Sequence, residues 1–460
     1  EDLLARLTLE EKVGLVHANG KFRAGGVERL GVPPLWTADG PQGVREELGI
    51  DSWQPAGWTS DFATAMPVGM ALASTWDPGL AEAYGRVVGD EARARGKHVI
   101  LGPALNIQRT PLCGRTYDYF GEDPWLAGRM TVGYVKGMQA EQTIACIKHF
   151  AANNQEQDRG TIDVQVDERP LREIYLPAFE AGVREGGALA VMAAYNKLRG
   201  QHAGHHDYLL NQVLKREWGF TGAVISDWGG THDTREAALN GLDLEMGTNK
   251  PYDQYYLAGP FLAGLKDGTF PVSVLDDKVR RNLRILIASG GLDGRRPGTI
   301  NTRAHQDVAL RVARDGIVLL KNEPSVLPLD LATLKTIAVV GDNALLRFAA
   351  GGNAAGVKAF HEITALEGLL ARVGGRADVV FSQGYRQPKR RPYGQRDAAG
   401  VRTSELTAAS PEEAKDLGDR AVETARRADA VLFVGGLTHQ SGADDEGVDR
   451  RDLLLPAHQD

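Results

Sequence analysis

Cysteine is scarce in this sequence, and so are the features that anchor a chain in a membrane or draw it to nucleic acid. Only 2 cysteines occur among 460 residues, too few for a disulfide framework, so an apolar core must hold the fold. No run of about 18 apolar residues occurs, which excludes a membrane-spanning helix. Lys and Arg number 53 against 60 Asp and Glu, a net charge of -7, so charge gives no case for nucleic-acid binding.

The N-terminus lacks a basic segment followed by an apolar one. Residues 1–7 already have the pattern of an amphipathic helix, so a signal peptide is either absent or already removed. The compartment stays open, and a periplasmic or secreted location is favoured over a cytoplasmic one. The composition, 42% hydrophobic and 25% charged, is that of a folded globular protein and excludes disorder.

Short apolar runs alternate with helical patterns over the first 290 residues. Four of these runs predict strands, at residues 99–101, 143–147, 188–193 and 222–225. Two segments between them have apolar residues at helical spacing, 170–185 and 208–218. Apolar strands that alternate with helices indicate a parallel sheet buried on both faces. The length suits a (β/α)8 TIM-like barrel, and a doubly wound sheet is the alternative.

A second domain is predicted after a stretch rich in Gly, Arg and Pro at residues 289–298. A helix over residues 305–315 leads into three further predicted strands, at residues 336–340, 379–381 and 430–434. We therefore predict an α/β chain with three parts, a barrel over residues 1–290, a linker over 291–304 and a second α/β sandwich domain over 305–460. The chain stops soon after the third of these strands, so we expect the second domain to be incomplete at its C-terminus.

Polar residues follow three of the predicted barrel strands. Lys148 and His149 follow the strand at 143–147, Tyr195 follows that at 188–193, and Asp227 follows that at 222–225. In parallel barrels the carboxyl ends of the strands carry the catalytic residues. A carboxylate after a buried strand also needs cations or donors to hold its charge, and Lys148 and His149 are candidates. Each residue alone also suits an ordinary strand-end cap, but three such strand ends on one rim favour a functional site.

Six short motifs occur in a fixed order along nearly the whole chain. They lie at residues 7–13, 39–45, 114–124, 148–150, 219–228 and 446–456. In this order they resemble glycoside hydrolase family 3, the branch of β-glucosidases and β-xylosidases. The resemblance implies hydrolysis of a glycosidic bond with retention of configuration.

Two catalytic carboxyl groups are implied by this resemblance. Asp227 matches the nucleophile, which must be ionised when it attacks the anomeric carbon. Glu446 matches the acid/base, which protonates the departing oxygen and later acts as base. An exposed acid beside Asp444 and Asp445 is the plain alternative for Glu446, but the following Gly-x-Asp-Arg favours catalysis. Retaining enzymes place the two carboxyl groups roughly 5–5.5 Å apart, so the Glu446 loop must reach over the barrel mouth.

The resemblance also implies a sugar pocket, in which Asp39 binds the hydroxyls at the non-reducing end. Charged residues implied to line the pocket are Arg45, Arg115, Lys148, His149 and Arg159. Apolar or aromatic walls are implied at Met192, Tyr195 and Trp228, although Met192 suits a plain core residue almost equally well. Because Asp39 would close the far end of the pocket, we expect exo action that releases one sugar.

The chain departs from the family pattern at two positions. Asp118 stands where the family usually has Glu, and Asn353 lies where the family often presents a serine toward the sugar. We expect Asn353 to take the place of that serine, which leaves the specificity beyond the first ring open.

Neither a metal nor a cofactor is expected. His202, His205 and His206 cluster in the sequence, but their spacing matches no standard metal site. Cys113 and Cys146 are interpreted as two buried or free thiols, although the sequence does not settle whether they pair.

We therefore predict a retaining exo-acting β-glucosidase that acts on small β-glucosides or oligosaccharides through a glycosyl-enzyme intermediate on Asp227. A β-xylosidase or a broad-specificity exo-β-glycosidase is the alternative, because Asp39 and its arginines do not distinguish a hydroxymethyl group. A catalytically silent carbohydrate-binding relative is a remoter one. The family's N-acetylglucosaminidases fit less well, because residues 148–150 do not continue as Pro-Gly-His. We expect no nucleic-acid or membrane partner, and homo-oligomerisation is left open.

Overall fold

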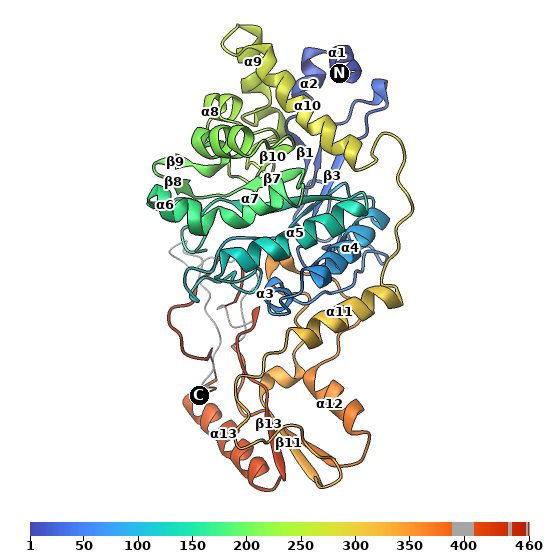
Figure 1. Cartoon of the computed structure of the whole chain (residues 1–460), viewed down its shortest axis with the longest axis vertical. Coiled ribbons are helices and arrows are strands. Elements are labelled where there is room, and N and C mark those ends of the chain that lie inside the picture. Colours follow the sequence, from blue (N-terminus) through green and yellow to red (C-terminus); the bar gives the residue numbers. More distant parts are fainter. Residues whose placement is uncertain (389–408, 440–443, 457–458, 460) are drawn as a thin grey trace. The chain divides into compact units, whose positions relative to one another are not determined.

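The computed structural model describes residues 1–388, 409–439, 444–456 and 459, which form two compact units (Figure 1). Unit 1 consists of Glu1–Thr110, Thr116–Ile317 and Ala354–Phe360. Unit 2 consists of Pro111–Arg115, Val318–Asn353 and His361–Asp460.

These units differ in three places from the predicted division into domains, and one of them is Pro111–Arg115, which belongs to unit 2 rather than to the barrel. Helix α11 (Arg303–Asp315), predicted at the start of the second domain, packs against α3 (Gly69–Ala73) and α4 (Pro78–Ala94) in unit 1. The buried ring of His305 lies with Nδ1 2.9 Å from Glu91 Oε1 and anchors this helix. Residues 354–360 also return to unit 1, where Ala359 pairs with Ala63.

The sheet of unit 1 is closed. Its strands follow the order β1 (Ala18–Gly20), β2 (Arg23–Ala24), β3 (Leu35–Asp39), β4 (Val99–Leu101), β5 (Ile144–Phe150), β7 (Ala190–Ala193) and β10 (Ala223–Ser226). Beyond β10, Leu244 pairs with Ile225, and Glu245 pairs with His17 beside β1. The backbone N–H of Ala18 donates to the Glu245 carbonyl at 2.8 Å, which completes the ring. The predicted TIM-like barrel is thereby confirmed.

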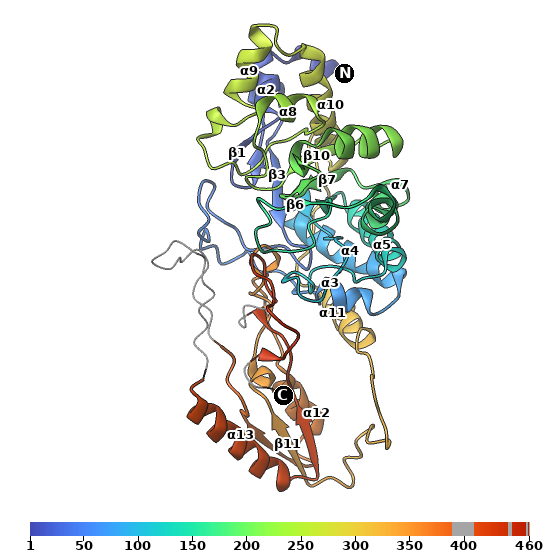
Figure 2. The ribbon, with the colours of Figure 1, turned by 90° about the vertical axis from the view of Figure 1, so that its left-hand side faces the viewer.

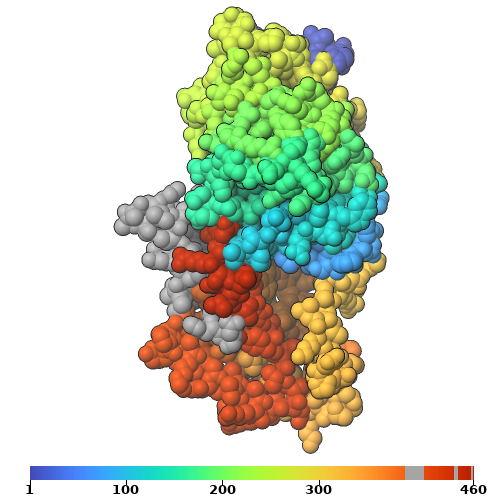
Figure 3. All heavy atoms as spheres, turned by 60° about the vertical axis from the view of Figure 1, so that its left-hand side comes forward, coloured from blue at the N-terminus to red at the C-terminus, as the bar shows by residue number. Residues whose placement is uncertain are grey.

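One strand departs from the regular parallel pattern of such a barrel. Neighbours from β3 to β10 run parallel, whereas β2 is antiparallel to both β1 and β3. Every residue of β4, β5, β7 and β10 is buried, because helices and loops cover the strands from outside and side chains fill the barrel. Figure 3 shows that side chains of the green and blue segments of unit 1 make a continuous surface on one face.

Helices α4 and α5 (Pro124–Ala140), each 17 residues long, lie side by side (Figure 1). Both α4 and α5 begin after an aspartate that caps the first turn, Asp77 or Asp123, followed by proline. Close packing of the pair requires glycine, since a Cβ on Gly85 would overlap the Tyr134 carbonyl oxygen. The other helices and short strands of unit 1 are α1 (Asp2–Arg6), α2 (Leu9–Gly14), η1 (Glu28–Leu30), β6 (Asp163–Val164), α6 (Glu168–Pro170), η2 (Leu171–Tyr175), α7 (Pro177–Arg184), β8 (Lys197–Leu198), β9 (Gln201–His202), η3 (Ala203–His205), η4 (Tyr208–Glu217), α8 (Thr234–Leu239), η5 (Tyr252–Gln254), α9 (Gly259–Lys266) and α10 (Val272–Ala288).

Unit 2 contains a parallel sheet in the order β12 (Asp378–Ser382), β11 (Thr336–Val340), β13 (Ala430–Phe433). Each strand lies within one residue of its predicted position at both ends, and β11 is buried at the centre. Helix α13 (Pro411–Arg426) packs along β11 and β12 (Figure 2). The remaining described helices are η6 (Asp342–Leu345), α12 (Ala365–Val373) and η7 (Asn353–Ala355). Of η7, only Asn353 belongs to unit 2, because the segment Val318–Asn353 ends there.

Two predictions about the chain as a whole can be compared with this structure. Cys113 and Cys146 are both buried, in line with the interpretation as two thiols. Crossing a bilayer needs a helix of about 20 mostly apolar residues, and none of the helices in the described part of the chain meets this requirement.

Candidate active site

Polar side chains from three barrel strands meet at the carboxyl-terminal edge of the sheet in unit 1. Asp39 ends β3, Lys148 and His149 lie near the end of β5, and Asp227 directly follows β10. Lys148 Nζ lies 3.8 Å from Asp39 Oδ1, and His149 Nε2 lies 3.7 Å from Asp227 Oδ2. The predicted gathering of charged residues on one rim is therefore present.

Asp227 is a buried carboxylate surrounded by donors. Its residue is 7% exposed, and its Oδ1 accepts a 2.8 Å hydrogen bond from the backbone N–H of Trp228. Burial raises the pKa of Asp227, whereas the positive charges of Arg159 and Lys148 and hydrogen bonds from Trp228 and Tyr195 act against this rise. The arrangement thus offers a poorly hydrated anion whose charge is held by fixed neighbours.

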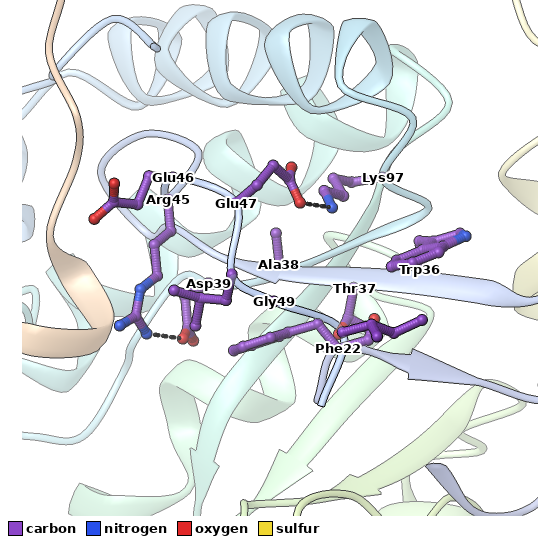
Figure 4. A pocket seen from close by; sticks show the side chains of 12 residues that line it. Phe22, Trp36, Thr37, Ala38, Asp39, Arg45, Glu46, Glu47, Gly49 and Lys97 are labelled. Carbon is purple, nitrogen blue, oxygen red and sulfur yellow. Dashed lines mark hydrogen bonds and ion pairs between the residues drawn. The ribbon is translucent and has the colours of Figure 1, made fainter. Parts of the chain in front are cut away.

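Asp39 is held at the far side of the rim by two cations. Arg45 Nη1 donates to its Oδ2 at 3.0 Å, and Lys148 lies on the side of its other oxygen. Figure 4 shows Arg45 reaching the Asp39 carboxylate at the edge of a pocket that Phe22 also lines. Each carboxylate oxygen can accept more than one hydrogen bond, so Asp39 can bind hydroxyl groups while it stays fixed.

His149 is oriented by a residue that the sequence did not single out, Asn106. The Asn106 side chain accepts from the backbone N–H of His149 at 2.9 Å and donates to its carbonyl oxygen at 2.8 Å. These two bonds fix which end of the amide is oxygen. His149 Nδ1, 3.2 Å from that oxygen, therefore carries a proton, and the other ring nitrogen faces Asp227.

Arg159 is held in place by Glu156, which was also missed. Arg159 Nη1 donates to Glu156 Oε2 at 2.6 Å, and the Glu156 residue is 3% exposed. The guanidinium group lies over the Tyr195 ring, with Cζ 4.6 Å from the ring centroid. Both contacts orient the cation that opposes the raised pKa of Asp227.

Aromatic rings continue outward from the nucleophile candidate. The Trp228 indole donates to the Lys21 carbonyl at 2.8 Å, and its ring centroid lies 5.1 Å from that of Phe22. The centroid of the Phe22 ring in turn lies 6.0 Å from that of the Trp53 ring, and Trp53 is 48% exposed. Sugar rings pack their C–H faces on such side chains, so this row is suited to a second ring beyond the reacting one.

Two of the predicted residues, Arg115 and Glu446, lie in unit 2, whereas the others lie in unit 1. Arg115 is buried, and its Nη1 lies 3.9 Å from Glu446 Oε1. Burial raises the pKa of the nearby Asp444 to about 7, which makes that carboxyl a second acid to be tested. Residues 440–443 of the predicted acid/base loop lie outside the described residues.

Family models match both halves of the chain. The model of the glycosyl hydrolase family 3 N-terminal domain matches residues 5–285, and that of the C-terminal domain of the same family matches residues 317–460. This chain belongs to glycosyl hydrolase family 3.

Curated and solved relatives of this family 3 chain carry related names. A β-glucosidase of Bacteroides ovatus is 45% identical over 100% of the chain and 62% of its own length. An exo-α-(1→6)-L-arabinopyranosidase of Bifidobacterium longum is 36% identical over 98% of the chain and 56% of its own length. The solved structure of DesR, a β-glucosidase from Streptomyces venezuelae in complex with D-glucose, covers 100% of the chain and 69% of its own at a TM-score of 0.87 and 30% identity. The chain thus spans less than two thirds of the curated relatives.

The structure gives the surroundings of three residues that the sequence analysis singled out, Met192, Asp118 and Asn353. Met192 is 2% exposed inside β7, opposite Ile225 of β10, so its binding role stays a prediction beside a clear packing role. Asp118, the departure from the family's Glu, is buried at 2% exposure. Asn353, expected to face the sugar, directs its amide N–H groups to Asp445 and Glu446.

The rings of His202, His205 and His232 form a packed cluster. The rings of His202 and His232 lie 3.9 Å apart, and His206 Nε2 lies 3.0 Å from the Leu198 carbonyl oxygen. Burial lowers the pKa of His232 to about 4 and also lowers that of His202, so these rings are neutral at pH 7. Among the described residues, no group of three or more His, Cys, Asp or Glu side chains could hold a metal ion.

Replacing Arg159 by Gln should shift the acid limb of the pH profile. Arg159 favours the ionised form of Asp227, so its loss raises the pKa of Asp227 further above its usual range. The nucleophile must be charged, so kcat/KM should begin to fall at a higher pH on acidification. The variant Arg169→Gln is the control, because Arg169 is an exposed arginine paired with Glu173. A limb unmoved in Arg159→Gln would contradict the electrostatic role of Arg159.

Proposed function

We propose that this chain carries out retaining, exo-acting hydrolysis of terminal non-reducing β-D-glucosyl residues. The observation that carries the proposal is the buried Asp227 at the end of β10, with Lys148 and Arg159 as its counter-charges and the fixed Asp39 beside Lys148. A neutral, polyhydroxylated ring needs hydrogen bonds to charged groups at one end and a reactive carboxylate at its anomeric carbon. The β-glucosidase names of the family 3 relatives support the same assignment.

In the first step, Asp227 attacks the anomeric carbon and the bond to the leaving oxygen breaks. The carboxyl group of Glu446 gives its proton to that oxygen, so the leaving group departs as a neutral alcohol. Desolvation of Asp227 favours attack, because a buried carboxylate gains more from bond formation than a hydrated one. His149, held by Asn106, keeps a ring nitrogen beside Asp227 throughout this step.

In the second step, the glycosyl ester on Asp227 is hydrolysed. Glu446, now a carboxylate, takes a proton from water, and the resulting hydroxide attacks the anomeric carbon from the face that the leaving group left. Asp227 departs as a carboxylate, and the two inversions together retain the configuration. Asp39 would bind the hydroxyls farthest from the reacting carbon, which supports the release of one sugar at a time.

A broader exo-glycosidase, which also accepts pentopyranosides such as β-xylosides, is the second candidate. The Bifidobacterium longum relative is named for arabinopyranose, a ring without a hydroxymethyl group. Ion pairs link Asp39 to Arg45 and to Lys148. These charged groups do not form a shaped apolar wall around a hydroxymethyl group, so they give no reason to reject the smaller ring.

A panel of nitrophenyl glycosides separates these candidates. We expect kcat/KM for the β-glucoside to exceed that for the β-xyloside by about tenfold or more, since one lost substituent is worth about 1–3 kcal/mol. Equal turnover of the two substrates would establish the broader activity instead. No turnover of any glycoside by the full protein would favour a silent carbohydrate-binding relative and contradict the proposal.

A further inference from the structure

The side chain of Asn353 is bound to the segment that carries Glu446. Its Nδ2 donates to Asp445 Oδ1 at 3.0 Å and to the backbone carbonyl oxygen of Glu446 at 3.1 Å. An amide nitrogen has two hydrogens, so both donors of Asn353 are used within unit 2. The N–H groups of Asn353 therefore bind the Glu446 segment rather than a sugar.

Asp445 links the same amide to the other polar backbone group of Glu446. The Asp445 residue is 2% exposed, and its Oδ1 also accepts from the backbone N–H of Glu446 at 2.8 Å. The carbonyl of Glu446 is bound by Asn353 directly, and the N–H of Glu446 is bound through one shared carboxylate oxygen. The backbone from which the Glu446 carboxyl projects is therefore held at its carbonyl by Asn353 and at its N–H by Asp445, which Asn353 also binds.

A second strip of chain fixes the residues that follow Glu446. The backbone N–H of Gly114 donates to Asp449 Oδ1 at 2.9 Å, and that of Arg450 donates to the Leu112 carbonyl oxygen at 2.8 Å. The strip approaches so closely that a Cβ on Gly114 would overlap the Val448 carbonyl oxygen. These bonds hold the far side of the turn, whereas Asn353 holds Glu446 itself.

The backbone at Asn353 suits this task. Its φ is +52°, in the left-handed region where Asn, Asp and Gly are the residues that fit with least strain. Of these three, only Asn has a side chain with two hydrogens to donate. Conformation and hydrogen bonding together therefore select asparagine at this position.

We propose that Asn353 is a positioning residue for the acid/base carboxyl of Glu446. This inference rests on the proposed function, in which Glu446 protonates the departing oxygen. Proton transfer requires the acid within hydrogen-bond reach of that oxygen, at about 2.6–3.2 Å. The hydrogen bond from Asn353 restricts the backbone of Glu446, and Arg115 lies beside its carboxyl group. Both contacts limit how far the carboxyl can move from the departing oxygen.

The test compares two variants that keep the left-handed backbone but lose the donors, Asn353→Asp and Asn353→Gly. The substrates are methyl β-glucoside, whose leaving group needs a proton, and 2,4-dinitrophenyl β-glucoside, whose leaving group does not. We expect both variants to lower kcat/KM for methyl β-glucoside by about 10- to 100-fold more than kcat/KM for 2,4-dinitrophenyl β-glucoside. The reason is that a 1 Å misplacement of a catalytic group costs on the order of 100-fold in rate. A loss of folded protein lowers both rates equally and cancels in their ratio.

Two further variants of the full protein decide the interpretation. Glu446→Ala should change the same ratio at least as strongly, and Asn301→Asp should leave it unchanged. Asn301 makes the control because it also has a left-handed backbone, with φ +49°, and lies in unit 1. If Glu446→Ala changes the ratio and neither Asn353 variant does, the positioning role is wrong while the proposed function stands. If Glu446→Ala leaves the ratio unchanged, the positioning role and the acid/base assignment of Glu446 are both wrong.

Discussion

Replacing Asp227 by Ala is expected to lower kcat for 4-nitrophenyl β-glucoside by about 10,000-fold or more, the scale seen when an enzyme loses a residue of its nucleophilic machinery. The reason is chemical, because the reaction needs a carboxylate at the anomeric carbon and alanine has none. Asp39 is bound to Arg45 and Lys148. Steady-state rates of purified wild type and variant, with the same active-site concentration, measure the loss.

The stability of the same variant serves as its control. Burial already raises the pKa of Asp227, so the folded state gains nothing from holding this group ionised. Lys148 and Arg159 keep Asp39 and Glu156 as partners after the substitution. We therefore expect a melting temperature close to that of wild type. A variant that is well folded and still as active as wild type would show that the nucleophile assignment is wrong.

Replacing Glu446 by Ala is expected to have the second largest effect, and one that depends on the substrate. For poor leaving groups, kcat/KM should fall by about 100- to 10,000-fold, the range that general acid catalysis contributes. For 2,4-dinitrophenyl β-glucoside the first step needs no proton, so the glycosyl-enzyme should form quickly and then accumulate. Azide needs no general base, so its addition should speed the second step and release β-glucosyl azide.

The variant Asp444→Ala is the matched control for this experiment. Asp444 lies two residues before Glu446, and burial raises its pKa to about 7, as would suit a general acid. We expect the Asp444 variant to keep the leaving-group dependence of wild type and to show no response to azide. An equal loss on both substrates in Glu446→Ala, or an azide response in Asp444→Ala instead, would exclude Glu446 as the acid/base.

The buried strands of both units were predicted well from their apolar runs, because burial on two faces leaves a local pattern in sequence. The runs at residues 99–101 and 336–340 coincide with β4 and β11. The first three strands were missed, since β1 and β2 are short and the motif at residues 39–45 includes only the last residue of β3. Closure through Leu244 and Glu245 left no signal either, because it consists of isolated backbone pairs.

The candidate site was predicted mainly through motifs, and its supporting residues were not. Asp39, Lys148, His149 and Asp227 meet as the parallel strand ends require. Two supporting residues were missed, Asn106, which binds His149, and Glu156, which binds Arg159. Asn353 was named from the sequence, but as a sugar contact rather than as a partner of Glu446. Such bonds depend on three-dimensional contact and have no characteristic spacing, so only the folded structure identifies them.

The most direct test of the account is to trap its covalent intermediate. A 2-deoxy-2-fluoro-β-glucosyl fluoride should react with the protein, because its good leaving group favours the first step and the fluorine slows the second. Mass spectrometry of the digested protein should then find one fluoroglucosyl group, attached to Asp227 and absent from Asp227→Ala. Attachment to a different carboxylate, or hydrolysis that proceeds with inversion at the anomeric carbon and no adduct, would contradict the account.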